Sequence, residues 1–284
     1  MLYVVLFFIT VFQGLSLWSL TDGSGGAGST HQPFARISIR DYEQLVRLVP
    51  VPISKSSHRP VQRYPVVVKT CDKSSYCIMH GYVERQNNSH FVDTLTDEWQ
   101  DEVYAHAYSL ASVGNFTKIV DVGCGSGYKL MKYFSWSGNG TIGLDVEPTL
   151  SFLRKKYQPF QWYAVNETIP NHIRVDVDLL MSADVIEHVI DPNNFMKFLL
   201  SFNAKLYVLS SPERVSCRGA SSRGPPENVH HVREWSRSEF VSYVGQFLRV
   251  LGSFTADTGT FGTENVRFDC SQWVVATRSL NVKT

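Results

Sequence analysis

A turn rich in glycine follows a short apolar segment near the middle of the chain. Residues 118–122 read Lys-Ile-Val-Asp-Val and run directly into Gly123-Cys-Gly125-Ser-Gly127. Glycine has no Cβ, so such a turn lets the backbone bend sharply and lets a ligand approach it closely. Taken alone the turn is weak evidence, because tight strand-to-helix turns also use glycine for packing.

An acidic residue stands where the next apolar segment ends. Asp145 lies 24 positions beyond Asp121 (145 − 121 = 24). A carboxylate at such a position accepts hydrogen bonds from both hydroxyls of a nucleoside ribose. The dinucleotide fingerprint needs a glycine where this chain has Tyr128, and that glycine helps the helix approach a pyrophosphate closely. The pattern therefore favours a nucleoside cofactor without phosphates and leaves a nicotinamide-dependent oxidoreductase as an alternative.

Three histidines are candidates for removing a proton from a substrate. His188 follows the expected fourth strand, and His230 and His231 lie in an insert at 224–235. Imidazole is the side chain best matched to proton transfer near neutral pH. A role in bracing their loops is about as plausible for all three.

A metal-assisted reaction is a minor alternative. Asp184, Glu187 and His188 offer oxygen and nitrogen ligands of the kind that metal ions use,. They come from one short loop, so we expect no bound metal and keep magnesium as the less favoured option.

Alternating apolar strands and helices must position these residues. Strands are expected at 118–122, 141–145, 160–165, 178–183, 205–210, 249–254 and 271–277, and helices at 127–134, 149–157, 192–202 and 237–247. An earlier helix carries Trp99, Val103, Ala107 and Leu110 at helical spacing,. Continuous apolar strands alternating with helices predict a mainly parallel sheet covered on both faces. The last two strands follow each other directly, so we expect them to pair antiparallel at one edge.

The motifs resemble those of a known family. Val-Asp-Val-Gly-Cys-Gly-Ser-Gly at 120–127, with Gly-Leu-Asp ending at Asp145, resembles the first two motifs of class I S-adenosylmethionine-dependent methyltransferases. The segment 182–192 is similar to the motif after strand four in the type 11 and related small-molecule groups. The resemblance covers about Trp99 to Thr277.

This resemblance implies an α/β, Rossmann-like fold: a seven-stranded, mainly parallel sheet with helices on both faces and an antiparallel edge strand. It implies S-adenosyl-L-methionine as cofactor. The residues expected to contact it are Asp121, Gly123, Cys124, Gly125, Gly127, Asp145, Val146, Asn166 and Asp184. His-Val-Arg-Glu-Trp at 231–235 is similar to a phrase of bacterial members, which favours His231 over His188 and His230 as the catalytic base.

Two features indicate the class of methyl acceptor: the residues after the fifth strand and the net charge of the chain. After the fifth strand, methyltransferases that act on exocyclic or amide nitrogen have a motif similar to Asn/Asp-Pro-Pro-Tyr. This chain has Ser-Ser-Pro-Glu at the same place, 210–213, and does not resemble them there. Lys and Arg exceed Asp and Glu by one (27 − 26), so charge gives no reason to expect a nucleic acid partner. We expect O-methylation of a small molecule or a sugar, with an inactive binding protein of the same fold as the alternative; the oligomeric state is not predicted.

The chain divides by composition. Residues 1–20 form an uncharged apolar leader, 21–34 a Gly/Ser linker, 35–95 an irregular N-terminal cap broken by prolines, and 96–280 the methyltransferase domain. The leader has the length of a signal peptide or a marginal anchor but lacks a preceding basic residue. We favour a cytoplasmic catalytic domain, and a secretory or membrane-anchored one if the leader acts as a signal or an anchor.

Cysteines and glycosylation triplets bear on the same question. Five cysteines without repeated spacing favour free thiols, although Cys71 and Cys77 are close enough to pair,. Asn-x-Ser/Thr triplets begin at Asn87, Asn115, Asn139 and Asn166. Such triplets recur by chance, and two of them adjoin expected core strands, where we expect a glycan to be hard to accommodate.

Overall fold

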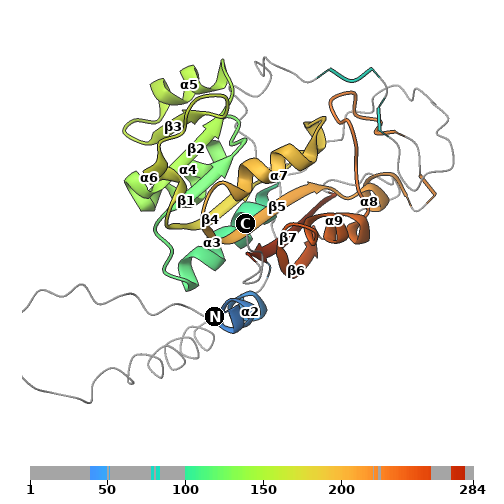
Figure 1. Ribbon diagram of the computed structural model, residues 1–284, viewed down its shortest axis with the longest axis horizontal. Helices are drawn as coiled ribbons and strands as arrows, with labels where there is room; N and C mark the ends of the chain where they lie inside the picture. Colours follow the sequence, from blue (N-terminus) through green and yellow to red (C-terminus); the bar gives the residue numbers. More distant parts are fainter. Residues whose placement is uncertain are drawn as a thin grey trace, which may run out of the picture. The chain divides into compact units, whose positions relative to one another are not determined.

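A computed structural model describes residues 39–49, 51, 78–79, 81–83, 100–219, 221–222, 225–256 and 270–278 (Figure 1). The apolar leader and the Gly/Ser linker lie outside these residues, as does most of the expected cap. Within the described part of the chain, no helix combines the length and apolarity needed to cross a membrane.

The elements alternate as the sequence predicts. The strands are β1 (Ile119–Val122), β2 (Thr141–Asp145), β3 (Gln161–Ala164), β4 (Val177–Ser182), β5 (Ala204–Pro212), β6 (Arg249–Thr255) and β7 (Ser271–Thr277). The α-helices are α2 (Ile39–Leu48), α3 (Asp101–Val113), α4 (Tyr128–Phe134), α5 (Thr149–Lys156), α6 (Asn171–Arg174), α7 (Pro192–Leu200), α8 (Arg214–Arg218) and α9 (Arg237–Val244). Two 3-10 helices are η3 (Ser135–Gly140) and η4 (Ile186–His188).

All seven strands join one sheet in the order β3-β2-β1-β4-β5-β7-β6. The first five strands run parallel, and β7 pairs antiparallel with both β5 and β6. The expected antiparallel pairing at one edge is therefore confirmed, with β7 lying inside it and β6 forming the edge itself. The strand order reverses between β1 and β4, which is where open α/β sheets bind their ligands.

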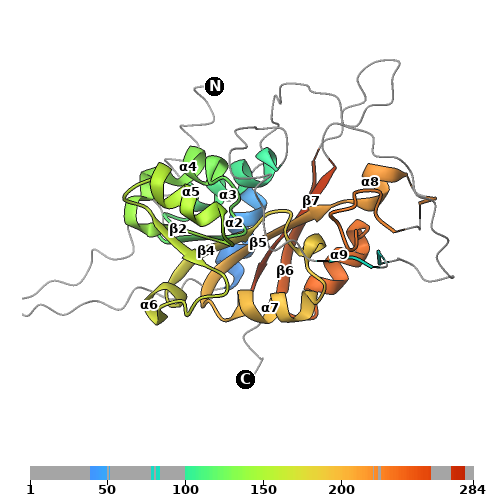
Figure 2. The ribbon, with the colours of Figure 1, turned by 90° about the horizontal axis from the view of Figure 1, so that it is seen from above.

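Helices cover both faces of the sheet, because alternate strand residues point to opposite sides. On one face Ile119, Leu179 and Leu206 pack with residues of α2, α3, α4 and α5. On the other face Val120 and Leu180 pack with residues of α6, α7 and α9. Figure 2 shows these two groups of helices on opposite sides of the sheet. The predicted Rossmann-like architecture is confirmed.

Local capping signals place two of the helices. The Asp191 carboxylate accepts a hydrogen bond from the backbone N–H of Asn194 at the start of α7, as expected of a cap before a proline,. At α9, Ser236 and Glu239 form a capping box. Trp235 and Phe240 flank that box with ring centroids 5.7 Å apart, which matches a hydrophobic staple,.

Two expectations are wrong. Residues 35–95 were expected to form an irregular cap, yet Ile39–Leu48 form α2, which buries Tyr42 and Val46. Free thiols were favoured, yet Cys217 and Cys270 form a disulfide with Cα atoms 5.3 Å apart. The bond joins the end of α8 to the start of β7, 53 residues apart in sequence.

One carboxylate joins the amino ends of three strands. The Asp178 side chain accepts hydrogen bonds from the backbone N–H groups of Thr117 (2.8 Å) and Lys118 (2.9 Å) and from Nζ of Lys205 (2.5 Å). Burial alone would raise the pKa of Asp178, but the hydrogen bonds from Lys205 and from the two backbone groups hold it below the ordinary value of 3.8.

We expect Asp178→Asn to lower the free energy of unfolding by about 1–3 kcal/mol near neutral pH, since hydrogen bonds to a charged acceptor are lost. A depressed pKa stabilises the folded state above the unfolded value of 3.8 and loses that effect as the pH falls through the folded value. We therefore expect urea unfolding to show a smaller difference in the free energy of unfolding between wild type and variant at about pH 3 than at about pH 7. A difference independent of pH would contradict this account.

Candidate active site

The glycine turn after β1 adopts a conformation that ordinary residues avoid. Gly123, Gly125 and Gly127 have φ values of 81°, 54° and 70°, all in the left-handed region,. The backbone N–H of Gly123 donates to the carbonyl of Leu144 (2.7 Å), and that of Gly127 donates to the carbonyl of Cys124 (3.0 Å). The turn is therefore fixed against the end of β2 before α4 begins.

The three glycines serve different purposes. A Cβ at Gly123 would lie 2.3 Å from Cγ2 of Val185, and one at Gly127 would lie 2.6 Å from Cδ2 of Leu153. A Cβ at Gly125 would meet no atom within 4 Å. Two glycines therefore allow close packing, while the middle one borders open space where a ligand can approach the backbone.

Asp145 ends β2 beside this open space. Its Oδ2 accepts a hydrogen bond from the backbone N–H of Gly125 and its Oδ1 from that of Val146, both at 2.7 Å. Burial raises the pKa of Asp145 to about 6, and these two hydrogen bonds limit the rise. Each carboxylate oxygen has two lone pairs, so both retain the capacity to accept a ribose hydroxyl.

Asp121, in β1, is fully buried under the turn. Its Oδ2 accepts a hydrogen bond from the hydroxyl of Tyr104 in α3 (2.7 Å), while its Oδ1 has no partner among the described residues. Burial raises the pKa of Asp121 to about 7, against the lowering effect of the Tyr104 hydrogen bond. Tyr104 was not predicted, because nothing in a helix of mixed apolar residues marks one tyrosine as reaching a strand.

The other expected cofactor residues take different places. Cys124 is buried and packs in the apolar core through its side chain. Asn166 is exposed in the turn after β3, next to Val165, whose N–H donates to the carbonyl of Asp145. Asp184 follows β4 and accepts hydrogen bonds from the hydroxyls of Ser210 (2.6 Å) and Ser271 (3.1 Å).

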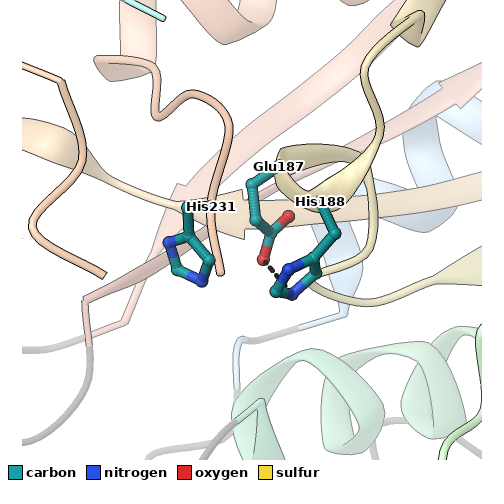
Figure 3. Close-up of side chains that lie close together, drawn as sticks. All are labelled: Glu187, His188 and His231. Carbon is teal, nitrogen blue, oxygen red and sulfur yellow. Dashed lines mark ion pairs between the residues drawn. The ribbon is translucent and has the colours of Figure 1, made fainter. Parts of the chain in front are cut away.

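A second group of residues lies beyond the end of β4. Potential ligand atoms of Glu187, His188 and His231 all lie within 4.8 Å of one another. Figure 3 shows the first two coming from η4 and His231 approaching from the insert after β5. Val185, which precedes η4, is the residue that packs on Gly123, so this cluster lies next to the cofactor turn.

Hydrogen bonds fix the protonation pattern of both imidazole rings. Nδ1 of His188 lies 2.6 Å from the backbone carbonyl of His230, which can only accept, so this nitrogen carries the proton,. Nδ1 of His231 lies 2.7 Å from Oε1 of Glu234, and a carboxylate likewise accepts. The lone pair of each ring, when neutral, is therefore on Nε2, and Nε2 of His231 lies 3.0 Å from the amide nitrogen of Asn228, which donates to it,.

Glu187 is the unusual member of the cluster. The residue is 0% exposed, and neither carboxylate oxygen has a hydrogen-bond partner in the described part of the chain. Nε2 of His188 lies 3.8 Å from its Oε1 (Figure 3). Burial, and then the charge of Asp184, raise the pKa of Glu187 well above its ordinary value. A buried carboxylate of this kind needs a proton or a cation.

Several supporting residues were not predicted. Nε of Arg218 in α8 lies 3.0 Å from Oε2 of Glu234, so a guanidinium holds the carboxylate that orients His231. Although burial alone would raise the pKa of Glu234, the His231 hydrogen bond and the charge of Arg218 hold it below the usual range. The hydroxyl of Tyr82 donates to the backbone carbonyls of His188 (2.8 Å) and His230 (3.1 Å).

Of these supporting residues, only Glu234 could have been found from the sequence, because it lies three residues after His231, the favoured catalytic base. Of the three predicted histidines, the structure brings His188 and His231 together. His230 contributes its backbone carbonyl, and its imidazole is not part of the cluster of three.

These residues fit both a nucleoside cofactor and a metal ion. The open space at Gly125, the retained acceptor capacity of Asp145 and the unpartnered Oδ1 of Asp121 suit an adenosyl group with a cationic amino acid end. One carboxylate and two imidazole nitrogens suit a divalent transition metal better than magnesium, which prefers oxygen ligands.

The chain is similar to solved structures of methyltransferases. The methyltransferase domain of bacterial CtHen1 aligns with a TM-score of 0.46 and 19% identity, over 63% of this chain and 98% of that one. Magnesium protoporphyrin IX methyltransferase from Synechocystis PCC 6803, with S-adenosylhomocysteine bound, aligns with a TM-score of 0.45 and 16% identity, over 63% and 83% of the two chains.

A third structure of the same class is 1,6-didemethyltoxoflavin-N1-methyltransferase from Burkholderia thailandensis. It aligns with a TM-score of 0.44 and 14% identity, over 62% of this chain and 78% of that one. All three are methyltransferases, the class that the sequence motifs resemble. No protein-family model matches the sequence, and no curated protein matches it.

The burial of Glu187 gives a test that needs no ligand. A raised carboxyl pKa makes the folded state lose stability as the pH rises above the unfolded value, because the folded state holds its proton longer. We expect Glu187→Gln, measured with a chelator present, to be more stable than wild type by roughly 1–3 kcal/mol at about pH 8. Urea unfolding should show this gain shrinking towards about pH 5; a gain that does not change with pH would contradict a raised pKa.

Proposed function

We propose that this protein is an S-adenosylmethionine-dependent methyltransferase that uses a divalent metal to methylate a hydroxyl of a small molecule or a sugar. The observation that carries the metal site is the buried carboxylate of Glu187, which has no hydrogen-bond partner among the described residues and lies beside the imidazoles of His188 and His231. The cluster adjoins the glycine turn, so acceptor and cofactor would lie side by side.

The cofactor half of the proposal assigns separate tasks to the buried acids. Asp145 holds the ribose hydroxyls, and Gly125 lets the cofactor approach the backbone. Oδ1 of Asp121 has no hydrogen-bond partner among the residues that the structure describes, which suits the ammonium group of the cofactor, directly or through water. Val146 and Asn166 would border the adenine, since they follow β2 and β3 at the same edge of the sheet.

The chain's own residues then have two tasks in the reaction. When bound, S-adenosylmethionine supplies a methyl group on a positively charged sulfur, so the electrophile is already activated. Alignment of acceptor oxygen, carbon and sulfur contributes at best about 7–11 kcal/mol to lowering the barrier. The second task is to favour loss of the hydroxyl proton to solvent, and a metal held at this site would assist by lowering the pKa of that hydroxyl.

Glu187, His188 and His231 would hold that metal. The carbonyl of His230 orients the His188 ring and the carboxylate of Glu234 orients the His231 ring, as is usual for metal-binding histidines,. Two nitrogens and one oxygen favour Mn²⁺, Fe²⁺, Co²⁺ or Zn²⁺ over Ca²⁺. This set differs from the loop of Asp184, Glu187 and His188 considered in the sequence, because His231 joins it from the insert.

A second mechanism uses His231 alone as the general base. The 2.7 Å contact between its Nδ1 and Glu234 favours this alternative, because a carboxylate partner fixes the orientation of the ring,. This mechanism leaves the buried Glu187 without a role. The two mechanisms differ in whether a chelator stops the reaction.

Cofactor binding tests the first half of the proposal. Calorimetry with S-adenosylhomocysteine should show saturable binding, and Asp145→Ala should weaken it about 10- to 100-fold, because hydrogen bonds to a charged acceptor are lost. Since burial sets the pKa of Asp145 to about 6, wild-type affinity should fall as the pH drops through that value. Asp176→Asn, at an exposed acid before β4 on the opposite edge, is the matched control. Equal affinity of Asp145→Ala and wild type would remove Asp145 from the site.

Metal dependence tests the second half. Methyl transfer to a panel of hydroxylated metabolites, glycans and ribose-terminated RNA should stop with a chelator and return with Mn²⁺ but not with Ca²⁺. Glu187→Gln and His231→Ala should each abolish Mn²⁺ binding in calorimetry while changing S-adenosylhomocysteine affinity by less than about threefold. His230→Ala keeps the carbonyl that holds His188, so it should retain metal binding.

Three results would count against these assignments. Full activity in the presence of chelator, with loss of activity in His231→Ala, would establish the general-base mechanism instead. Methyl transfer to RNA alone would contradict a small-molecule or sugar acceptor. Cofactor binding without turnover on any acceptor would support the inactive binding protein.

A further inference from the structure

Three Asn-x-Ser/Thr triplets lie within the described residues, and all three asparagines are exposed in turns or short helices rather than in strands. They are Asn115 before β1, Asn139 in η3 before β2, and Asn166 after β3. Asn115 and Asn139 themselves precede the strands, although Thr141, the third residue of the Asn139 triplet, begins β2 and is buried.

Two of these asparagines lie at the edge of the sheet away from the candidate active site. Asn115 and Asn139 precede the amino ends of β1 and β2, which are adjacent parallel strands with Ile119 opposite Thr141. The cofactor turn lies at the carboxyl ends of the same strands. A glycan on either asparagine would leave that edge open, whereas one on Asn166 would stand beside the proposed adenine position.

The surroundings of Asn115 suit a sugar. A surface hollow there is lined by Asn115, Tyr108 and Trp136, among other residues. Tyr108 is 40% exposed and Trp136 is 50% exposed, so both rings are accessible in this hollow. The indole N–H of Trp136 donates to the carbonyl of Tyr133 (2.8 Å), so the ring is held in place. The apolar face of a pyranose ring packs well on such a fixed aromatic ring.

The disulfide is an independent indication of the compartment. Disulfides such as Cys217–Cys270 form and persist in oxidising environments and are rare where cellular thiols are kept reduced,. Asn-linked glycans are added in the same secretory compartment. The composition of residues 1–20, apolar and without charge, is compatible with entry into it.

We propose that the chain folds in an oxidising secretory compartment and carries N-linked glycans on Asn115 and Asn139. In each modification the side-chain amide nitrogen of asparagine forms a bond to C1 of the sugar. The bond from C1 to the pyrophosphate of a polyprenyl-linked oligosaccharide donor breaks, and the lipid pyrophosphate and an amide proton leave. The two cysteine thiols give up two protons and two electrons to a disulfide-bearing oxidant protein.

This proposal does not depend on the methyl acceptor or the metal, and a direct experiment tests it. The full chain, produced in eukaryotic cells, is treated with peptide N-glycosidase under denaturing conditions. We expect its mass to fall, and we expect peptide mass spectrometry to find the asparagine-to-aspartate conversion at positions 115 and 139. Alkylation without reductant should leave Cys217 and Cys270 unlabelled.

Matched variants separate glycosylation from folding. Asn115→Asp removes the triplet and keeps a residue that tolerates the left-handed φ of 51°,, so the protein should lose the mass of one glycan. Thr117→Ser keeps the triplet and should lose none. Asn139→Asp and Thr141→Ser form the corresponding pair at the second site. Unmodified peptides at 115 and 139 from the wild-type chain, or alkylation of Cys217 and Cys270 without reductant, would overturn the proposal.

Discussion

Buried carboxylates at the carboxyl edge of the central strands impose the main constraint on this protein. Asp121, Asp145 and Glu187 lie at or beyond the ends of β1, β2 and β4, and burial raises the pKa of each. An ionised carboxylate inside a protein costs several kcal/mol unless it is paired or hydrogen-bonded. Backbone N–H groups donate to both oxygens of Asp145 and the Tyr104 hydroxyl donates to one oxygen of Asp121, whereas neither oxygen of Glu187 accepts a hydrogen bond from any described residue. The number of carboxylate oxygens without a hydrogen-bond donor among the described residues thus increases from the acid of β2 to the acid after β4. A cationic ligand would contribute most stabilisation where that number is highest.

The glycine turn places two candidate sites side by side at this edge of the sheet, one for the cofactor and one around Glu187. Because Gly123 lacks a Cβ, Val185 packs directly on the turn, and η4 follows immediately. Gly125, in contrast, leaves space in front of the backbone. One residue type therefore brings the loop of Glu187 close to the cofactor turn and keeps room for the cofactor. Larger side chains at these positions would separate the two sites or fill the first of them.

Local patterns were sufficient to predict the strands, the capped helices and the cofactor turn, because these depend on residues close together in sequence. Tyr104 and Tyr82 could not be predicted, since a hydrogen bond from Tyr82 to His188 spans 106 positions and leaves no periodic trace. The disulfide between Cys217 and Cys270 escaped for the same reason, as only the fold brings the two cysteines together. Helix α2 was not predicted for another reason. Its buried residues recur at helical spacing, but several prolines follow it, and prolines are typical of irregular segments.

The disulfide holds both sides of the candidate active site. Cys217 precedes Arg218, whose guanidinium holds the carboxylate that orients the histidine of the insert. Cys270 precedes Ser271, whose hydroxyl donates to the acid after β4. One covalent bond therefore joins two segments that each reach the site through the next residue. Such a bond stabilises a fold mainly by reducing the conformational freedom of the unfolded chain. The two segments are joined covalently only when the cysteines are oxidised, which connects the site to the redox conditions under which the chain folds,.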